Sequence, residues 1–114
     1  MIDDEPGIAD LVSWCLDPLG VRVLLATGRD SACTVARQSD VGLVLLDLSL
    51  DGEDGLDILP DLQREPSLAG VPFVAFSAHD SRRREALQRG VVSFLARPFA
   101  NADLFSLVRS HLRN

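Results

Sequence analysis

Two residue types are missing from this chain, and both absences bear on its chemistry. There is no lysine and no tyrosine, so all 11 cationic residues are arginine. The 17 acidic residues outnumber them, which gives a formal charge of −6 and an isoelectric point near 4.7. Nonspecific binding to nucleic acid requires a basic surface, so we expect no direct contact with nucleic acid.

The chain also has little cysteine and no long apolar segment. Cys15 and Cys33 form no CxxC pattern and fall on predicted helices, which favours buried free thiols over a disulfide or a metal site. It contains no apolar span of about 18 residues and no signal peptide, so we expect a cytoplasmic protein without membrane contact. The length of 114 residues predicts one domain, 1–114.

The most apolar run spans residues 41–46 and ends at Asp47. It reads Val-Gly-Leu-Val-Leu-Leu without polar alternation, which is typical of a strand buried on both faces of a parallel sheet. In such folds the reactive groups gather at the carboxyl ends of the strands. Asp47 is therefore the first candidate for a functional residue.

The rest of the chain alternates between strand and helix patterns. The predicted strands cover residues 21–26, 41–46, 71–76 and 91–96, and the predicted helices cover residues 5–19, 30–38, 55–64, 80–90 and 101–112. This alternation predicts a doubly wound α/β sandwich of the (βα)5, flavodoxin-like type. The expected sheet is parallel and five-stranded, in the order 2-1-3-4-5.

The first predicted helix carries an apolar stripe at 3.6-residue spacing. The stripe consists of Ile8, Leu11, Val12, Cys15, Leu16 and Leu19. Pro6 suits the first turn, where its missing N–H costs little. Trp14 lies off the stripe, which leaves two interpretations open: packing against a neighbouring helix, or contact with a partner.

The first strand is very short or truncated. Only Met1 and Ile2 precede the acidic pair, where about five apolar residues should form a central strand. Buried ladder groups left unpaired would each cost about 1–3 kcal/mol, against a net stability of roughly 5–15 kcal/mol. We therefore expect that the chain continues upstream of Met1, or that another chain covers the gap.

Three carboxylates should meet at one edge of the predicted sheet. Asp3 and Asp4 follow the first strand and Asp47 follows the third, its neighbour. At about 4 Å and an effective dielectric near 20, each ionised pair costs roughly 4 kcal/mol, so the cluster calls for a cation. Oxygen ligands of this kind suit Mg²⁺. The alternative is that these acids are solvated loop charges.

Ser77 and Arg97 end the fourth and fifth strands and should face the carboxylates from the other side. A hydroxyl and a cation opposite a metal-bound carboxylate form a set of ligands for an anion. This arrangement predicts that Asp47 receives a phosphoryl group, with Arg97 neutralising its oxygens and Ser77 donating a hydrogen bond.

The chain resembles the receiver domains of two-component response regulators over essentially its whole length. The resemblance rests on four segments in order, which are Asp3-Asp4-Glu5-Pro6, Asp47 with Gly55 eight residues later, Phe73-Val74-Ala75-Phe76-Ser77-Ala78, and Phe94-Leu95-Ala96-Arg97-Pro98-Phe99. It implies that Asp47 is the phosphoacceptor. It also implies that Mg²⁺ is held directly by Asp4 and Asp47, through water by Asp3, and by the backbone carbonyl of Ser49.

The resemblance implies roles for several further residues. Ser77 matches the hydroxyl that follows the phosphoryl group, and Phe94 matches the aromatic switch that turns inward with it. The Arg97–Pro98 peptide bond is expected to be cis. Ser49 and His79 stand at positions that set the lifetime of the phosphoryl group, although His79 also fits an exposed loop histidine.

Three departures from the family pattern qualify these roles. Arg97 stands where the family has lysine, Asp51 where it usually has proline, and Phe94 lacks the hydroxyl of the commoner tyrosine. Arginine keeps the charge but replaces a compact donor by a wide planar fork. Because lysine is absent throughout, Arg97 has two alternative explanations: drift in composition, or loss of phosphorylation. The charge of Asp51 should slow the reaction with an anionic donor.

The fourth predicted helix is basic on an otherwise acidic chain, through Arg82, Arg83, Arg84 and Arg89. It is either a solvated face or, together with Trp14, a surface for partners. The resemblance implies a histidine kinase or phosphotransfer protein as partner. It also suggests a homodimer through the fourth helix, fifth strand and fifth helix, since similar domains show their switch there.

The leading prediction is a receiver domain of a phosphorelay that accepts a phosphoryl group on Asp47 with Mg²⁺. It would not be a conventional enzyme, although self-phosphorylation and autodephosphorylation at Asp47 stay open. The alternative is a phosphorylation-independent pseudo-receiver in which Arg97 pairs with Asp47 or Asp4. A third interpretation, a Mg²⁺-dependent phosphatase with an aspartyl nucleophile, would need an acid where Ser49 stands. We see no output domain within 1–114.

Overall fold

The computed structural model describes residues 1–5, 7–50 and 52–112. Two of the sequence predictions fall outside these residues: Pro6 in the first turn of a helix, and Asp51 as a charge beside the acceptor. Residues 113 and 114 also lie outside the described part of the chain.

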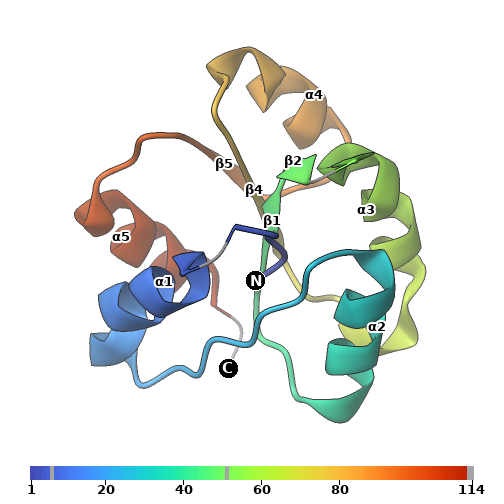
Figure 1. Cartoon of the computed structure of the whole chain (residues 1–114), viewed down its shortest axis with the longest axis horizontal. Coiled ribbons are helices and arrows are strands. Elements are labelled where there is room, and N and C mark those ends of the chain that lie inside the picture. Colours follow the sequence, from blue (N-terminus) through green and yellow to red (C-terminus); the bar gives the residue numbers. More distant parts are fainter. Residues whose placement is uncertain (6, 51, 113–114) are drawn as a thin grey trace.

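A parallel sheet lies at the centre of the molecule (Figure 1). Its strands, in spatial order, are β1 (Val44–Asp47), β4 (Phe73–Ser77) and β5 (Ser93–Ala96). The register places Asp47 beside Phe76 and Ser77 beside Ala96, so the carboxyl ends of the strands meet at one edge. Every residue of β1 and β4 is buried, as expected for strands that helices cover on both faces.

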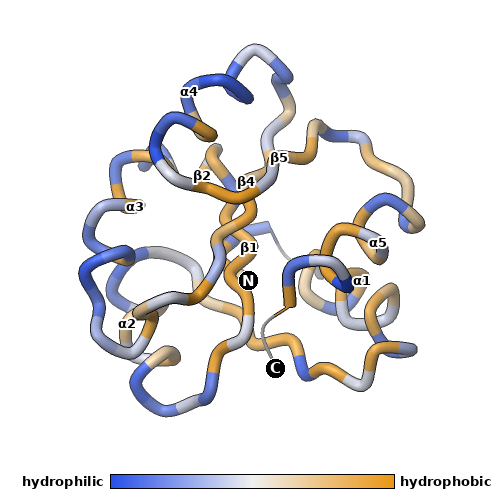
Figure 2. Tube along the Cα trace, turned by 180° about the vertical axis from the view of Figure 1, so that it is seen from behind, coloured by the Kyte–Doolittle hydropathy of each residue, from blue (hydrophilic) through white to orange (hydrophobic). Residues whose placement is uncertain are grey.

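Helices cover both faces of this sheet, which confirms the predicted α/β sandwich (Figure 1). The helices are α1 (Ile8–Leu16), α2 (Arg29–Gln38), α3 (Gly55–Arg64), α4 (Arg83–Gln88) and α5 (Asn101–His111), and the short 3₁₀ turns are η1 (Asp17–Leu19), η2 (Pro66–Leu68) and η3 (Asp80–Arg82). One core cluster joins α1 and α5 to the sheet, and the other joins α2, α3 and α4. Figure 2 shows the apolar residues concentrated along the central strands. Among the described residues, none of the helices has the length and apolarity needed to cross a bilayer.

A small antiparallel pair of strands follows the end of β1. It consists of β2 (Ser49–Leu50) and β3 (Glu53–Asp54), which do not join the central sheet. This pair leads the chain from Asp47 to the first turn of α3. The β2–β3 pair therefore borders Asp47, the predicted phosphoacceptor.

The predicted strand over residues 21–26 is wrong, because only Ala26 makes a strand-type bridge. Ile2 bridges in parallel to Ala26 on one side and to Leu46 on the other. Among the described residues, the backbone hydrogen bonds between this segment and Met1 or Asp3 involve Leu24 and Ala26, and its earlier part has no ladder partner there. The last three strands of the predicted order are adjacent as expected, whereas the first two are reduced to bridges.

Helix α1 packs through most of the stripe that the sequence predicts. Val12, Cys15 and Leu16 are buried, and the Cys15 thiol donates a hydrogen bond to the Asn101 carbonyl of α5 at 3.3 Å. The inward position predicted for Leu11 is wrong, since 53% of its surface is exposed. Ile8 and Leu19, at the two ends of the stripe, are half-buried and pack against the same core cluster.

Two further expectations for single residues can be compared with the structure. Both cysteines are free thiols as predicted, although Cys33 is only half-buried. Trp14 is 70% exposed, so the interpretation that it packs against a neighbouring helix is wrong. Its alternative interpretation as a partner contact stays a prediction.

Gly55 allows α3 to begin directly against the end of β1. Its N–H donates to the Leu48 carbonyl at 3.0 Å. A Cβ atom at this position would lie 2.8 Å from the Leu48 Cα and would also collide with the Asp47 carbonyl oxygen. Backbone atoms cannot yield to a methyl group as a flexible side chain can, so a side chain here would displace the chain that carries Asp47.

We predict that Gly55→Ala lowers the free energy of unfolding by about 1–3 kcal/mol, the usual cost of overpacking. Gly28→Ala is the matched control, because its added Cβ would meet only Glu53 Oε1, at an ordinary 3.6 Å. Urea unfolding of both variants measures the difference. Equal stability of the two variants would contradict the tight fit at Gly55.

Candidate functional site

Three carboxylates converge at the carboxyl edge of the sheet. Asp3 and Asp4 follow the Ile2 bridge, Asp47 ends β1, and each can place a carboxylate oxygen within 4.8 Å of the other two. Asp3 has no exposed surface and Asp47 has only 4%, whereas Asp4 is half-buried. The predicted convergence of these acids is therefore confirmed, and the alternative of solvated loop charges fails for the two buried ones.

Arg97 is the cation that faces this cluster. Its Nη2 donates to Asp3 Oδ2 at 2.7 Å and lies 3.7 Å from Asp47 Oδ2, and its Nη1 donates to Glu5 Oε2 at 3.3 Å. The sequence predicted pairing with Asp47 or Asp4, but the close buried partner is Asp3. Three carboxylates thus share the charge of one guanidinium.

The guanidinium of Arg97 is also held by the strands around it. It lies over the ring of Phe76, 4.6 Å from its centroid, in a cation–π contact. The backbone N–H of Arg97 donates to the Ser77 carbonyl at 2.7 Å. Its Nε atom is buried and has no hydrogen-bond partner in the described part of the chain. The peptide bond to Pro98 is cis, as predicted.

Asp47 is held in an environment that disfavours its charge. Burial raises the pKa of its carboxyl group, and the negative charge of Asp3 adds to the increase. The N–H of Ser49, which donates to Asp47 Oδ1 at 3.0 Å, and the charge of Arg97 oppose the shift. The net result is a raised pKa, so this carboxylate gains from any further positive charge brought to the cluster.

Ser77 lies on the neighbouring strand, one residue beyond the partner of Asp47. Its side chain is fully buried, and its hydroxyl oxygen accepts the N–H of His79 at 3.1 Å. The side chains of His79 and Ser49 are exposed beside the cluster. The structure therefore brings Ser77 and Arg97 to the same edge as the carboxylates, as predicted.

Phe94 of β5 points into the core, with 3% of its surface exposed. Arg83 of α4 holds it in two ways that the sequence did not reveal. Its guanidinium lies 5.0 Å from the centroid of the Phe94 ring, and its Nη1 donates to the Phe94 carbonyl at 3.3 Å. Arg83 thus joins α4 to the predicted switch residue.

Arg82 joins α4 to the loop that follows Asp47. It donates to both carboxylate oxygens of Asp54, at 3.1 and 2.9 Å. Asp54 also caps α3 by accepting the Leu56 N–H at 3.0 Å. Burial opposes ionisation of Asp54, but the hydrogen bonds from Arg82 and Leu56 outweigh it and lower its pKa.

The residues predicted as a partner surface do not form one surface. Arg82 and Arg83 hydrogen-bond to other residues of the chain, and Arg83 is nevertheless exposed, as Arg84 and Arg89 are. Trp14 lies on α1, which packs on the opposite face of the sheet from α4 (Figure 1). Contact with a partner at one of these places therefore does not imply contact at the other.

Two members of the site were not singled out from the sequence. The ring of Phe76 lies under the guanidinium of Arg97, and Glu5 accepts a hydrogen bond from Arg97 Nη1. Glu5 could have been found, because it follows the acidic pair in the segment that faces Arg97. Phe76 could not, since a phenylalanine in an apolar strand gives no sign that its ring lies under a cation.

Comparison with known proteins agrees with this geometry. The family model for the response regulator receiver domain matches residues 1–109. The receiver domain of NtrX from Brucella abortus is 30% identical and superimposes with a TM-score of 0.85, over 97% of this chain and 94% of that one. The chain spans only 26% of a longer NtrX chain, crystallised in complex with ADP, to which it is also similar.

Two further solved structures are similar at 26% identity. One is the receiver domain of the sensor histidine kinase PA1611 from Pseudomonas aeruginosa, with a magnesium ion coordinated in its active-site cleft; it has a TM-score of 0.80, over 96% of this chain and 92% of that one. The other is the BeF3-activated receiver domain of RstA from Klebsiella pneumoniae, with a TM-score of 0.83, over 99% and 96% of the chains. The match covers nearly the whole sequence, and the chain belongs to the response regulator receiver domain family of two-component systems.

Proposed function

We propose that this receiver domain accepts a phosphoryl group on Asp47 from the phosphohistidine of a histidine kinase or phosphotransfer protein. The observation that carries the proposal is the meeting of Asp3, Asp4 and Asp47 at one sheet edge, beside Ser77 and Arg97 from the next two strands. In the transfer, an oxygen of Asp47 forms a bond to phosphorus while the bond from phosphorus to the donor nitrogen breaks. The electron pair of that bond stays on the donor imidazole.

The attacking oxygen can be assigned from the contacts of Asp47. Its Oδ1 accepts the Ser49 N–H at 3.0 Å, whereas its Oδ2 is the oxygen nearer to Arg97, at 3.7 Å. We assign Oδ2 as the nucleophile, because the incoming phosphoryl oxygens would then meet the guanidinium. Arg97 would neutralise their charge, and the Ser77 hydroxyl would donate to one of them.

The donor set also fits Mg²⁺. Asp3, Asp4 and Asp47 offer carboxylate oxygens within 4.8 Å of one another, and the Ser49 carbonyl would add a neutral oxygen. Hard oxygen donors of this number suit Mg²⁺, which would supply positive charge to offset the crowded carboxylates and the phosphoryl oxygens. The magnesium in the cleft of the PA1611 receiver domain supports this assignment.

A change at Asp47 would reach β5 and α4 through Ser77, Phe94 and Arg83. Ser77 would turn toward the phosphoryl group, and Phe94 would follow and leave the guanidinium of Arg83. The exposed Arg84 and Arg89 would then present the altered face to a partner or to a second copy, through α4, β5 and α5. Ser49 and His79, exposed beside Asp47, would set the lifetime of the phosphoryl group.

A specific observation favours a second candidate, a phosphorylation-independent interaction module. Arg97 already binds the buried Asp3 at 2.7 Å and lies within ion-pair distance of Asp47. Its charge would thereby substitute for a metal ion, and the site would serve as a structural ion pair. The phosphatase interpretation finds no support, since Ser49 occupies the position of the required acid.

The first test is acceptance of a phosphoryl group. Incubation with acetyl phosphate and Mg²⁺ should add one phosphoryl group to the wild-type protein, detected by intact mass. Asp47→Asn should abolish the addition, because an amide is a poor nucleophile. Asp57→Asn, which makes the same change at an exposed position of α3, should leave it intact. A wild-type protein that stays unmodified would refute the leading proposal.

The second test separates the two candidates through Arg97. Without Mg²⁺, Arg97→Met should destabilise the fold by an amount near the lower end of about 3–5 kcal/mol, because Asp3 keeps a buried, unpaired charge. The exposed Arg84→Met is the matched control and should change little. Thermal unfolding with Mg²⁺ or with EDTA then decides. If Mg²⁺ raises the midpoint of thermal unfolding of the wild-type protein, the first candidate is supported. If Mg²⁺ raises this midpoint only in Arg97→Met, the second candidate is supported.

A further inference from the structure

Phe76 lies on the strand between the acceptor and its cation. Its strand, β4, separates β1, which ends at Asp47, from β5, which Arg97 follows directly. In the register of the sheet, Phe76 is the partner of Asp47 on one side and of Leu95 on the other. The pairing continues beyond β5, because the N–H of Arg97 donates to the Ser77 carbonyl at 2.7 Å. Phe76 therefore stands between Asp47 and Arg97 across the sheet.

The side chains of these three residues share one face of the sheet. Side chains alternate between the two faces along a strand, so Asp47 lies on the face of Leu45, and Arg97 on the face of Leu95. Leu45 and Phe76 are buried in the core cluster that joins α1 and α5 to the sheet, and Leu95 packs against it. The acceptor, the ring and the cation thus lie on the α1–α5 side.

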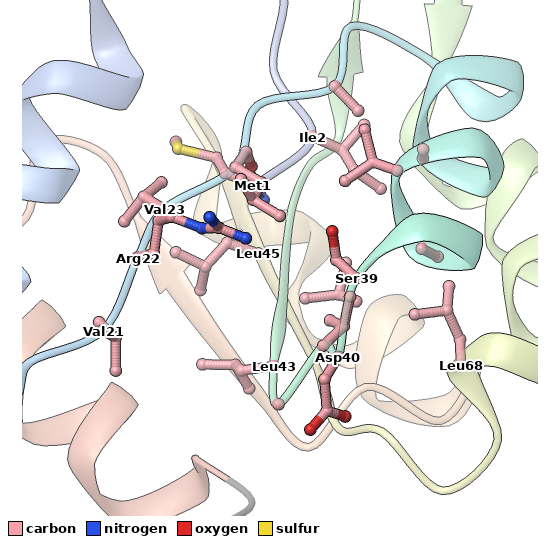
Figure 3. Close-up of a pocket in the computed structure, with 18 of the residues that line it drawn as sticks. Met1, Ile2, Val21, Arg22, Val23, Ser39, Asp40, Leu43, Leu45 and Leu68 are labelled. Atoms are coloured by element: carbon pink, nitrogen blue, oxygen red, sulfur yellow. Dashed lines mark hydrogen bonds between the residues drawn. The ribbon is translucent and has the colours of Figure 1, made fainter.

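Strand β1 presents apolar side chains on this face until it reaches Asp47. Leu43 and Leu45 line a pocket of about 390 Å³ toward the amino end of the sheet, where Figure 3 shows both side chains. The residues of β1 that precede Asp47 carry no charge. On this strand, the carboxyl edge is therefore the place where a cation finds a partner.

Arg97 reaches that edge by crossing β4 over the ring of Phe76. Two strand spacings, or about 9–10 Å, separate β5 from β1. The guanidinium carbon lies 4.6 Å from the centroid of the ring. Beyond it, Nη2 is 2.7 Å from Asp3 Oδ2 and 3.7 Å from Asp47 Oδ2. The ring thus supports the guanidinium partway along its path.

The ring also offsets part of the cost of burying this cation. Arg97 Nε is buried and has no hydrogen-bond partner in the part of the chain that the structure describes. A buried donor without a partner is costly, whereas a cation–π contact gains strength where water is excluded. Only 2% of the surface of Phe76 is exposed, so its contact with the guanidinium is shielded on the side of the ring.

The orientation of the ring is fixed by a second aromatic side chain. Phe99, two residues after Arg97, packs against Phe76 in an edge-to-face arrangement, with the ring centroids 6.3 Å apart and the planes at 73°. Such pairs constrain how the two rings lie. An aliphatic side chain at position 76 would fill part of the same space without offering a π face to the guanidinium.

We propose that Phe76 is a positioning residue that directs the charge of Arg97 to Asp3 and Asp47, and that its ring allows arginine to serve where related domains carry lysine. The inference rests on the proposed phosphoryl transfer, because charge held in place acts where the phosphoryl oxygens arrive. Phe76 acts through Arg97 and not on the phosphoryl group itself. Its replacement should therefore matter most while Arg97 is present.

The first test is a double-mutant cycle of Phe76→Leu and Arg97→Lys, read as the rate of phosphoryl addition from acetyl phosphate with Mg²⁺. Phe76→Leu should slow the addition by about 2- to 30-fold, the range spanned by exposed and desolvated cation–π contacts. The same change should slow Arg97→Lys less, because an ammonium has no planar group to stack on the ring. Equal effects in both backgrounds would overturn the proposal.

Phe73→Leu is the matched control for lost packing. Phe73 is buried in the same strand but belongs to the other core cluster. The variant should keep the wild-type rate under conditions where urea unfolding shows all forms to be folded. A loss of rate as large as that of Phe76→Leu would overturn the assigned role, because packing alone would then account for both variants.

The second test needs no phosphoryl transfer. The two Nη atoms of Arg97 donate to different carboxylates, so their ¹⁵N resonances should be separate in the wild-type protein and absent in Arg97→Lys. Phe76→Leu should merge them as the guanidinium becomes free to rotate, and Phe73→Leu should keep them apart. Separate resonances in Phe76→Leu would overturn the positioning role. If the wild-type protein accepts no phosphoryl group, the proposed function fails, and these resonances alone decide whether Phe76 positions Arg97.

Discussion

The crowding of negative charge at the carboxyl edge of the sheet is the constraint on which the rest of this structure depends. Asp3 and Asp47 are buried there, and Asp4 lies beside them. Carboxylates this close destabilise one another unless positive charge is supplied. Within the described residues, Arg97 is the cation whose ion pairs reach the cluster, and its stacking on Phe76 and its bond to Glu5 keep it there.

Arginine in place of lysine changes how the positive charge reaches the carboxylates. A lysine ends in one compact ammonium, whereas the planar guanidinium of Arg97 reaches Asp3 and Glu5 through two separate nitrogens. A guanidinium whose two terminal nitrogens already donate to carboxylates is harder to redirect toward a third partner. Competence as an acceptor therefore depends on how readily Arg97 exchanges Asp3 for phosphoryl oxygens. This exchange is the physical difference between a phosphoacceptor and a domain held by a permanent ion pair.

Much of the fold and most of the site follow from the sequence, for identifiable reasons. The buried run before Asp47 and the helical pattern over 55–64 are local signals: α3 has the predicted bounds, and the strand predicted over 41–46 appears as β1, which begins later, at Val44. The strand expected over 21–26 fails because a strand needs a neighbour, and the propensity of a segment does not report whether that neighbour is long enough. Side-chain partners chosen by three-dimensional packing, such as Phe76 under Arg97 and Arg83 over Phe94, leave no mark on spacing or composition.

The bidentate pair between Arg82 and Asp54 joins the segment after Asp47 to the start of α4. Asp54 caps α3 next to the acceptor loop, and Arg82 precedes α4. Consider any ligand that binds α4 with different affinity when this pair is closed or open. If the state of Asp47 also differs between the closed and the open pair, linkage requires that occupancy at Asp47 and occupancy at α4 bias each other by the same factor. The pair would then make each of these two regions of the chain respond to occupancy at the other.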